Sequence, residues 1–216
     1  NPIRRDIFFI KSETLTKDFD KSLPIVLIYG GNQGSHEINK RIFEVIKKLL
    51  NDCNVIHQTG NSSVTNDFKT ALEIKKNLPP ILNYRYTVRD YIMTEEVGEA
   101  LNKADLIFAR SGANNISEFL ALGKLCILMP IPKTSHDEQT KNAQFAVETG
   151  LGYILQQRDN LSAETVYQTI LLGLNQSKTN KGFLEEDLEA CREKAKKLII
   201  LDAPINVAEQ VEKIML

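Results

Sequence analysis

The chain has 216 residues, of which 42% are hydrophobic and 25% charged, the proportions of an ordinary soluble globular protein with one large domain or two small ones. Its 27 basic and 28 acidic side chains nearly cancel, which argues against a nucleic-acid-binding surface. The three cysteines are scattered and lack CxxC spacing, so neither a disulfide framework nor a zinc site is indicated, and a reducing, cytoplasmic setting is favoured.

The organisation of the chain suggests one main domain. No apolar run is long enough to span a bilayer, since the longest covers only Leu125 to Pro132. Because the first residue is Asn1 rather than Met, we expect an excised piece or a processed product, and a missing partner domain can then carry part of the chemistry. We expect residues 1–20 to be an interdomain linker and residues 21–216 to form a ligand-binding domain.

Short apolar runs alternate with longer amphipathic segments along the chain. The runs typical of buried strands are Ile25–Gly31, Asn54–Gly60, Leu82–Val88, Asp105–Ala109, Leu125–Ile131 and Tyr153–Gln156. The segments that predict helices are Ser35–Leu50, Val64–Leu78, Glu95–Lys103 with Thr94 as its cap, Ala113–Leu122, Asp137–Thr149, Ala163–Leu174, Phe183–Leu198 and Ile205–Met215. This alternation predicts an α/β, Rossmann-like fold, with a mostly parallel sheet, helices on both faces and a helical C-terminal tail.

The loop after the first strand is rich in glycine and reads GGNQGS from Gly30 to Ser35. In a doubly wound sheet, ligands bind beyond the carboxyl ends of the strands, near the point where the strand order reverses. Glycine lets a ligand approach the backbone, and the following helix offers unpaired N–H groups that suit a phosphate. The spacing is neither GxGxxG nor a P-loop, which weakens the dehydrogenase and NTPase interpretations. The alternative is a tight turn that binds nothing.

The segment after the fourth strand reads RSGANNISE from Arg110 to Glu118. Its small residues Ser111, Gly112 and Ala113 leave the helix start open to a ligand. Glu118 lies one to two turns into that helix, where its carboxylate can accept hydrogen bonds from ribose hydroxyls while the helix N-terminus meets a diphosphate. The alternative for a lone glutamate on a helix is a solvated side chain, and the neighbouring small residues favour the functional interpretation.

The segments after the fifth and third strands supply weaker signals. Gln139 and Asn142 are three residues apart on one helix face, where their amides can bind sugar hydroxyls. Glu138 fits a capping box with Ser135, and His136 fits a solvated loop imidazole or a ligand contact. After the third strand, the backbone of Val88 can pair with the edge of a base.

Some catalytic signatures are absent from the sequence. The only histidines are His36, His57 and His136, with no HxxxH pattern, and no GxSxG elbow occurs. His57 lies within an apolar strand, where a hydrogen-bonded core histidine is expected rather than a catalyst. Because no residue stands out as a general base, the chain is interpreted as the binding half of an enzyme.

Four segments together resemble the C-terminal domain of the MurG family. They are NPIRRD at the start, GGNQGS, ARSGANNISE, and MPIP followed six residues later by EQTKNA, and the similarity runs over essentially the whole chain. Members of that family transfer N-acetylglucosamine from UDP-N-acetylglucosamine to lipid I, which completes lipid II, the peptidoglycan precursor. The resemblance implies one half of a two-domain GT-B glycosyltransferase, with the donor bound mainly by this half.

The resemblance also implies roles for individual residues. Arg4 corresponds to an arginine near the donor phosphates, Val88 to an apolar position whose backbone reads uracil, and Gln139 to a glutamine on the sugar. Asn32 stands where the family often has serine, and Glu138 stands where relatives have glutamine or histidine. The expected donor-binding residues are Arg4, Gly31, Asn32, Val88, Ser111, Gly112, Ala113, Asn114, Asn115, Glu118, Gln139 and Asn142.

The expected reaction is an inverting displacement that needs neither a metal nor a cofactor, with the catalytic base in the missing N-terminal domain. That domain is also expected to bind lipid I and to hold the full-length protein on the cytoplasmic face of the plasma membrane. The isolated chain is expected to bind UDP-N-acetylglucosamine without transferring the sugar, and to bind no nucleic acid. The alternatives are the catalytic subunit of a two-chain N-acetylglucosaminyltransferase, a sugar-nucleotide epimerase of the same architecture, and a non-catalytic sugar-nucleotide-binding module.

Overall fold

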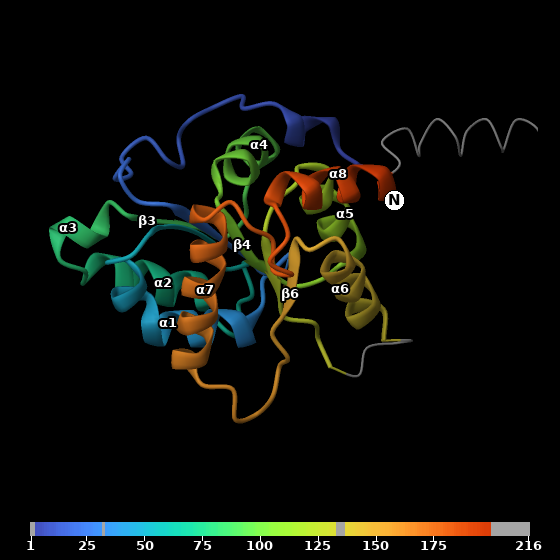
Figure 1. Ribbon diagram of the computed structural model, residues 1–216. Helices are drawn as coiled ribbons and strands as arrows, with labels where there is room; N and C mark the ends of the chain where they lie inside the picture. The colour runs from blue at the N-terminus through green and yellow to red at the C-terminus, as the bar shows by residue number, and fades with distance from the viewer. Residues whose placement is uncertain (1–2, 32, 133–136, 200–216) are drawn as a thin grey trace, which may run out of the picture.

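The computed structural model describes residues 3–31, 33–132 and 137–199, and it shows one parallel sheet between layers of helices (Figure 1). The six strands lie in the order β3-β2-β1-β4-β5-β6, and every neighbouring pair is parallel. The strands are β1 (Ile25–Tyr29), β2 (Asn54–Gln58), β3 (Tyr86–Arg89), β4 (Leu106–Ala109), β5 (Cys126–Leu128) and β6 (Gly152–Ile154). The predicted Rossmann-like fold is therefore confirmed.

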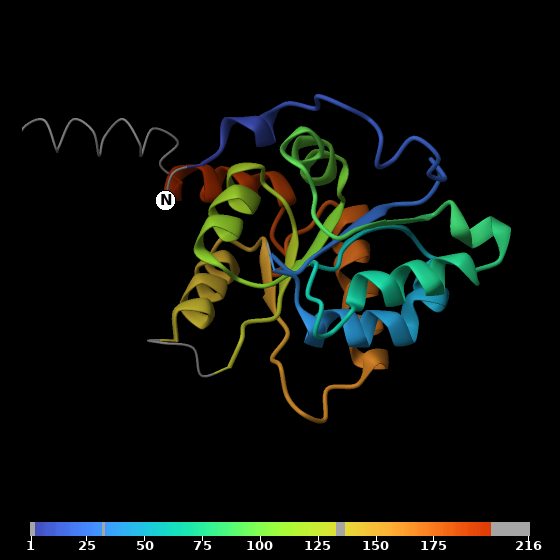
Figure 2. The ribbon, with the colours of Figure 1, turned by 180° about the vertical axis from the view of Figure 1, so that it is seen from behind.

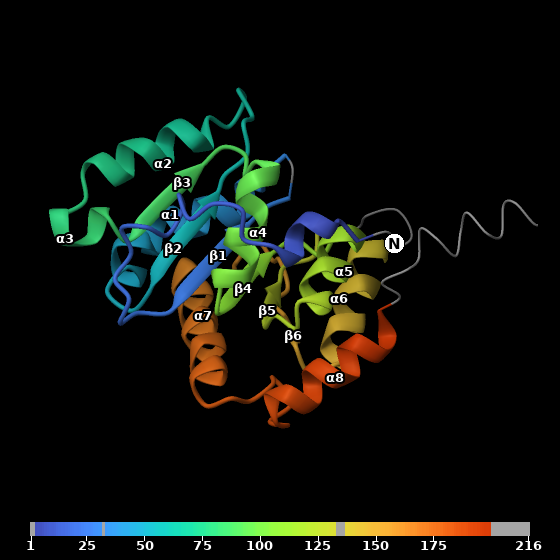
Figure 3. The ribbon, with the colours of Figure 1, turned by 90° about the horizontal axis from the view of Figure 1, so that it is seen from above.

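The helices cover both faces of this sheet. They are α1 (His36–Leu49), α2 (Asp67–Lys76), α3 (Pro80–Asn83), α4 (Thr94–Lys103), α5 (Ala113–Ala121), α6 (Glu138–Glu148), α7 (Ala163–Lys178) and α8 (Leu188–Leu198). Helix α1 packs against α2 and α7, whereas α5 packs against α6 and α8. Seen from above, α1 and α2 lie at one end of the sheet and α5, α6 and α8 at the other (Figure 3).

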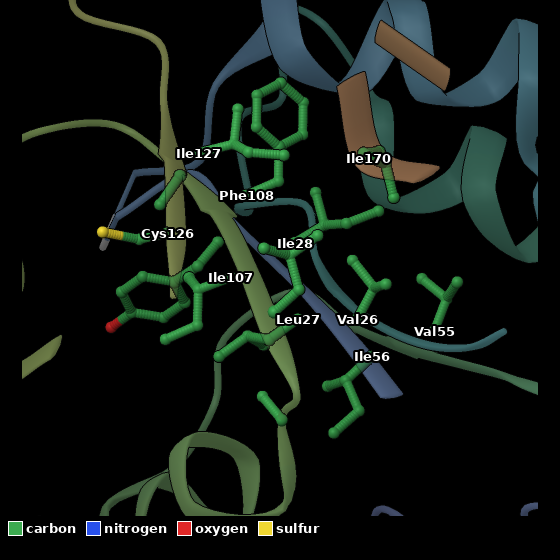
Figure 4. Close-up of a cluster of buried hydrophobic side chains, with 14 of the residues drawn as sticks. Val26, Leu27, Ile28, Val55, Ile56, Ile107, Phe108, Cys126, Ile127 and Ile170 are labelled. Atoms are coloured by element: carbon green, nitrogen blue, oxygen red, sulfur yellow. The ribbon is translucent and has the colours of Figure 1, made fainter. Parts of the chain in front are cut away.

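The central strands form the core because helices exclude water from both of their faces. Val26, Leu27 and Ile28 of β1 are fully buried, as are Ile107 and Phe108 of β4. Their side chains alternate between the two faces, where they meet residues of the neighbouring strands and of α7 (Figure 4). This rigid centre fixes the positions at which the loops after β1 and β4 begin. No helix in the described ranges has both the length and the apolar character needed to cross a bilayer.

The predicted strand Leu82–Val88 was wrong at its start. Pro79 and Pro80 do not simply end the preceding helix, because Pro80 opens the short helix α3, in which Asn83 N–H donates to the Pro79 carbonyl at 3.0 Å. Proline suits the first position of a helix, since its missing N–H would have no partner there. Leu82 is consequently helical, and the strand begins only at Tyr86.

Other differences concern the ends of elements. Strands β1 and β2 stop before the glycines that follow them, and α4 begins at Thr94, so that Met93 rather than Thr94 occupies the capping position. The polar segment 175–181 is helical as far as Lys178, and α8 begins at Leu188 instead of Phe183. The predicted helix Ile205–Met215 and the residues Asn32, Ser135 and His136 lie outside the described residues.

The N-terminal segment, which we expect to be a linker, packs onto α4 (Figure 2). Its short 3₁₀ helix η1 (Arg5–Phe8) approaches so closely that a Cβ on Gly98 would lie 1.9 Å from the Phe9 carbonyl oxygen. The buried carboxylate of Glu99 accepts hydrogen bonds from the backbone N–H groups of Leu15 and Thr16 at 3.0 and 2.9 Å. These contacts place Arg4, just before η1, against the main domain.

Candidate functional site

The carboxyl ends of β1 and β4 form the point at which the strand order reverses. These two strands are neighbours, yet the chain continues from β1 to β2 on one side and from β4 to β5 on the other. The loops after them therefore diverge and leave a cleft, which is where ligands bind in doubly wound sheets. A larger cavity of about 680 Å³ and a smaller cavity of about 430 Å³ lie there, and they share Gly31, Gln33, Gly112 and Asn115.

The glycine-rich loop forms the wall of the cleft next to β1. Gly34 has a φ of +76°, and a Cβ there would lie 2.0 Å from the Thr59 carbonyl oxygen, so this position requires glycine. Gln58 fixes the other end of the loop, because its Nε2 donates to the Gly31 carbonyl at 2.6 Å while its Oε1 accepts from Ile92 N–H at 3.1 Å. The tight turn of the loop is thus explained by its packing against Thr59 and by its hydrogen bond to Gln58. The loop also brings the N-terminus of α1 to the smaller cavity.

The segment after β4 forms the opposite wall. Gly112 caps α5 with extended backbone, and no heavy atom lies within 4 Å of the position where its Cβ would be. Gly112, Ala113, Asn114 and Asn115 all line the larger cavity, so the first turn of α5 faces open space as predicted. Ser111 is fully buried, and its carbonyl accepts a hydrogen bond from Asn142 Nδ2 at 3.1 Å. These two residues support the wall and are not among the residues that line the two cavities.

Arg4 and Glu118 form a two-pronged ion pair in the larger cavity. Arg4 Nε donates to Glu118 Oε1 at 2.7 Å, and Arg4 Nη2 donates to Oε2 at 2.8 Å. The hydrogen bond to Glu118 raises the pKa of Arg4 above its usual range. Glu118 is only 4% exposed, so it is not the solvated helix glutamate of the alternative interpretation. Both carboxylate oxygens expected to meet a ribose are thus held by Arg4.

Arg110 lies against the smaller cavity with a different set of partners. Its Nε donates to Ser35 Oγ at 2.9 Å and its Nη1 donates to the Met129 carbonyl at 2.7 Å, both of which are neutral acceptors. Within the described ranges, no carboxylate lies within ion-pair distance of this guanidinium. Burial lowers the pKa of Arg110 to about 10, which leaves it charged at neutral pH. An anion in the smaller cavity would balance this charge.

The remaining predicted residues divide between the cleft and its surroundings. Gln139 lines the smaller cavity, and its Oε1 accepts from Ile131 N–H at 3.1 Å. Glu138 lines the larger cavity. The structure does not bring Val88 to the cleft, because that residue is buried in β3 and its carbonyl accepts from Arg89 Nη1 at 3.2 Å. Tyr91, on the loop after β3, lines the larger cavity instead.

Several cleft residues were missed by the sequence analysis, and Arg110, Tyr29 and Gln33 are three of them. Arg110 was treated only as the beginning of its segment, Tyr29 as the interior of a strand, and Gln33 as part of the glycine loop. Tyr29 and Gln33 line the larger cavity, and Tyr29 is the last residue of β1. The rule that ligands meet the carboxyl ends of strands would have identified Tyr29 and Arg110, since each lies at the end of its strand.

His57 is a core residue, as predicted. Its Nδ1 lies 2.8 Å from the Tyr86 hydroxyl and its Nε2 lies 3.0 Å from Asn39 Oδ1, so both ring nitrogens have partners. Burial lowers the pKa of His57 to about 3, and the imidazole is therefore neutral at physiological pH. It is not among the residues that line the two cavities.

Comparison with known proteins places this chain in a family. The model of the glycosyltransferase family 28 C-terminal domain matches residues 25–200. A relative from Acetivibrio thermocellus is 29% identical over 219 residues, which cover 100% of this chain and 54% of the relative. One from Shouchella clausii is 33% identical over 175 residues, which cover 79% of this chain and 45% of the relative. Both are named UDP-N-acetylglucosamine--N-acetylmuramyl-(pentapeptide) pyrophosphoryl-undecaprenol N-acetylglucosamine transferase.

Among solved structures, MurG of Acinetobacter baumannii is similar to this chain with a TM-score of 0.67 and 25% sequence identity. The similarity covers 90% of this chain and 51% of that protein, which confirms the predicted match to one half of a GT-B glycosyltransferase. The chain likewise spans about half the length of the curated relatives it matches. It belongs to glycosyltransferase family 28 and corresponds to the C-terminal domain of that family.

Proposed function

We propose that the chain is the donor-binding domain of an enzyme that transfers N-acetylglucosamine from UDP-N-acetylglucosamine to lipid I, forming lipid II for peptidoglycan. The names of the relatives support this substrate pair. The observation that carries the proposal is the cleft at the strand-order reversal, where two helix N-termini converge with the charge of Arg110, which forms no ion pair with a carboxylate of the described residues. A diphosphate matches that arrangement in size and charge.

In this proposal, the two cavities hold different parts of the donor. The larger cavity takes the nucleoside, with the ribose beside Glu118, and Gln139 in the smaller cavity contacts the sugar. The diphosphate lies between them, against Gly31, Gly112 and Asn115, which border both cavities. For four further residues, a role in donor binding is proposed from the resemblance alone: Asn32, Val88, Ser111 and Asn142. Ser111 and Asn142 act by supporting the wall of the cleft.

The proposed chemistry is an inverting displacement at the anomeric carbon of the donor sugar. As the bond to UDP breaks, negative charge develops on the diphosphate, where the N-terminal dipoles of α1 and α5 and the guanidinium of Arg110 stabilise it. Such stabilisation can replace a metal ion. The base that accepts the proton of the lipid I hydroxyl is expected in the other half of the enzyme. That half is also proposed to bind lipid I and the cytoplasmic face of the membrane.

Calorimetric titration of the chain with UDP and with UDP-N-acetylglucosamine tests the proposal. We expect saturable binding of both and no sugar transfer to lipid I by this chain alone. A folded sample that gives no binding heat at millimolar UDP would overturn the donor-site assignment.

A substitution at Gly112 provides a control that separates binding from folding. Aspartate suits a helix cap with extended backbone, and Gly112→Asp adds a carboxylate to the open space in front of α5. We expect UDP affinity to fall about tenfold or more while the melting temperature does not decrease. The neutral Gly112→Asn variant should lose less affinity, because it occupies the same space without repelling phosphate.

A further inference from the structure

His36 and Asp67 form an ion pair at the edge of the smaller cavity. They are the first residues of α1 and α2, and His36 Nδ1 lies 2.9 Å from Asp67 Oδ1. The two side chains differ in environment, since that of His36 is 49% exposed and that of Asp67 only 5%. The other carboxylate oxygen of Asp67 accepts a hydrogen bond from Asn39 Nδ2 at 2.8 Å. Asp67 is therefore fixed by the buried Asn39, and its carboxylate orients the imidazole of His36.

This arrangement leaves one nitrogen of His36 without a partner in the described part of the chain. Nδ1 is engaged with Asp67, so Nε2 is the atom available to a ligand. His36 lines the smaller cavity together with Arg110 and Gln139. A protonated imidazole donates a hydrogen bond from each nitrogen, and histidine is the side chain whose charge ordinarily changes between pH 5 and 8.

The charged groups around His36 favour an anion at Nε2. Asp67 contacts the imidazole from α2, and Arg110 reaches the same cavity from the end of β4. Glu37, the neighbouring carboxylate on α1, also lines the smaller cavity, and it is paired with Arg41 at 2.6 Å and with Lys40 at 3.4 Å. The hydrogen bond from Arg41 lowers the pKa of Glu37, so that this carboxylate stays ionised but balanced.

We propose that His36, oriented by Asp67, binds the sugar-proximal phosphate of the donor through Nε2 as an imidazolium. This inference rests on the proposed function, because it takes the ligand of the smaller cavity to be a nucleotide diphosphate sugar. It gives the phosphate a second cation besides Arg110, which makes donor binding dependent on pH.

The test uses two substitutions that separate the functions of the two ring nitrogens. In His36→Asn, the amide keeps a donor near the position of Nδ1 and can still bond to Asp67, but no group remains at Nε2. His36→Gln reaches the position of Nε2 with a neutral amide. Lys47→Asn is the matched control, since Lys47 is an exposed residue on the same helix, away from the cavities.

A ligand series measured by calorimetry at pH 6.5 should locate the contact. We expect His36→Asn to weaken UDP and UDP-N-acetylglucosamine about tenfold, because a charge-assisted hydrogen bond is lost. UMP and uridine, which lack the second phosphate, should bind as they do to the wild type. If all four ligands weaken equally, His36 has only a structural role in shaping the loop, and the inference is overturned.

The pH profile supplies a second readout that a structural role would not alter. UDP-N-acetylglucosamine is the appropriate probe, because its diphosphate is esterified at both ends and has no proton that is lost near neutral pH. Its affinity should fall as the pH is raised for the wild type and for Lys47→Asn, and should stay flat for His36→Asn and His36→Gln. Identical profiles for the wild type and His36→Asn would overturn this inference alone. A wild type that binds no UDP would overturn the proposed function as well.

Discussion

The two cavities of the cleft contain one arginine each, and the two arginines differ in how their charge is balanced. In the larger cavity, Arg4 is paired with Glu118 through two short hydrogen bonds. In the smaller cavity, Arg110 donates only to a hydroxyl and a carbonyl. A ligand entering the larger cavity therefore meets an arginine whose charge is already balanced, whereas an anion entering the smaller cavity supplies a missing partner.

This difference indicates which part of a ligand each cavity can select. Exchange of one set of hydrogen bonds for another contributes little net free energy, but it discriminates against ligands that lack the matching hydroxyls. Balancing a buried charge contributes more, and any phosphate of suitable size can do so. We therefore expect the smaller cavity to supply most of the affinity for UDP and the larger cavity to supply most of the specificity for its nucleoside.

The largest expected effect is that of Arg110→Met. This substitution removes the guanidinium and keeps an unbranched side chain, and we expect UDP affinity to fall about 30-fold as charge-assisted hydrogen bonds to phosphate are lost. Calorimetric titration measures the change. Arg110→Lys is the control, because it keeps the charge and should recover part of the affinity. An unchanged dissociation constant for Arg110→Met would show that the diphosphate lies elsewhere.

A smaller effect is expected from Arg4→Met. Because Glu118 already neutralises Arg4, its removal should weaken UDP less than about fivefold, even though the same chemical group is deleted. The substitution leaves the Glu118 carboxylate without its partner, so the free energy of unfolding should fall by about 1 kcal/mol, a modest value because the Arg4 side chain is 42% exposed. Chemical denaturation measures this loss.

An equal loss of UDP affinity in the two variants would refute the proposed difference between the two arginines. If Arg4→Met weakens UDP as much as Arg110→Met does, the ion pair of the larger cavity must open on binding and give its full charge to the phosphates. Arg4 would then act as the family resemblance implies, and the assignment of affinity to the smaller cavity would be wrong.

The sequence was sufficient to predict the fold and the place of the cleft. Parallel strands have a strong signal, since each is a short apolar run followed by an amphipathic segment, and their carboxyl ends must meet at one edge. That rule selected the loops at Gly31 and Gly112, which line both cavities. The apolar-run signal for a strand was wrong at Leu82, because an apolar residue that follows two prolines fits a strand and a short helix equally well.

The pairing of charges across the cleft could not be predicted from sequence. Arg4 and Glu118 are 114 positions apart, and nothing in the local pattern of either residue indicates that they meet. The burial of Arg110 depends on Ser35 and Met129, which come from two other segments. The Val88 carbonyl accepts a hydrogen bond from the side chain of its neighbour Arg89, a contact that the sequence pattern does not predict.

The smallest expected effect on ligand binding is that of His57→Gln, which tests whether the smaller cavity owes its positive charge only to the groups that line it. His57 is linked to Asp67 through Asn39, but its pKa of about 3 keeps it neutral and it lines neither cavity. UDP affinity should therefore change less than about twofold, within the range of a distant substitution.

The effect of His57 should appear instead in the dependence of folding stability on pH. Its folded-state pKa lies below the value of about 6.5 for an unfolded histidine, so between these values the unfolded chain binds a proton that the folded chain does not. The free energy of unfolding is then complete above about pH 6.5 and falls as the pH is lowered, by up to about 1.4 kcal/mol per pH unit from this group. Denaturation from pH 7 to pH 5 should show a shallower decline for His57→Gln. Equal slopes would mean that burial does not lower the pKa of His57 in the folded chain. A loss of UDP affinity on this substitution would mean that Arg110 and His36 do not by themselves account for the attraction of the smaller cavity to anions.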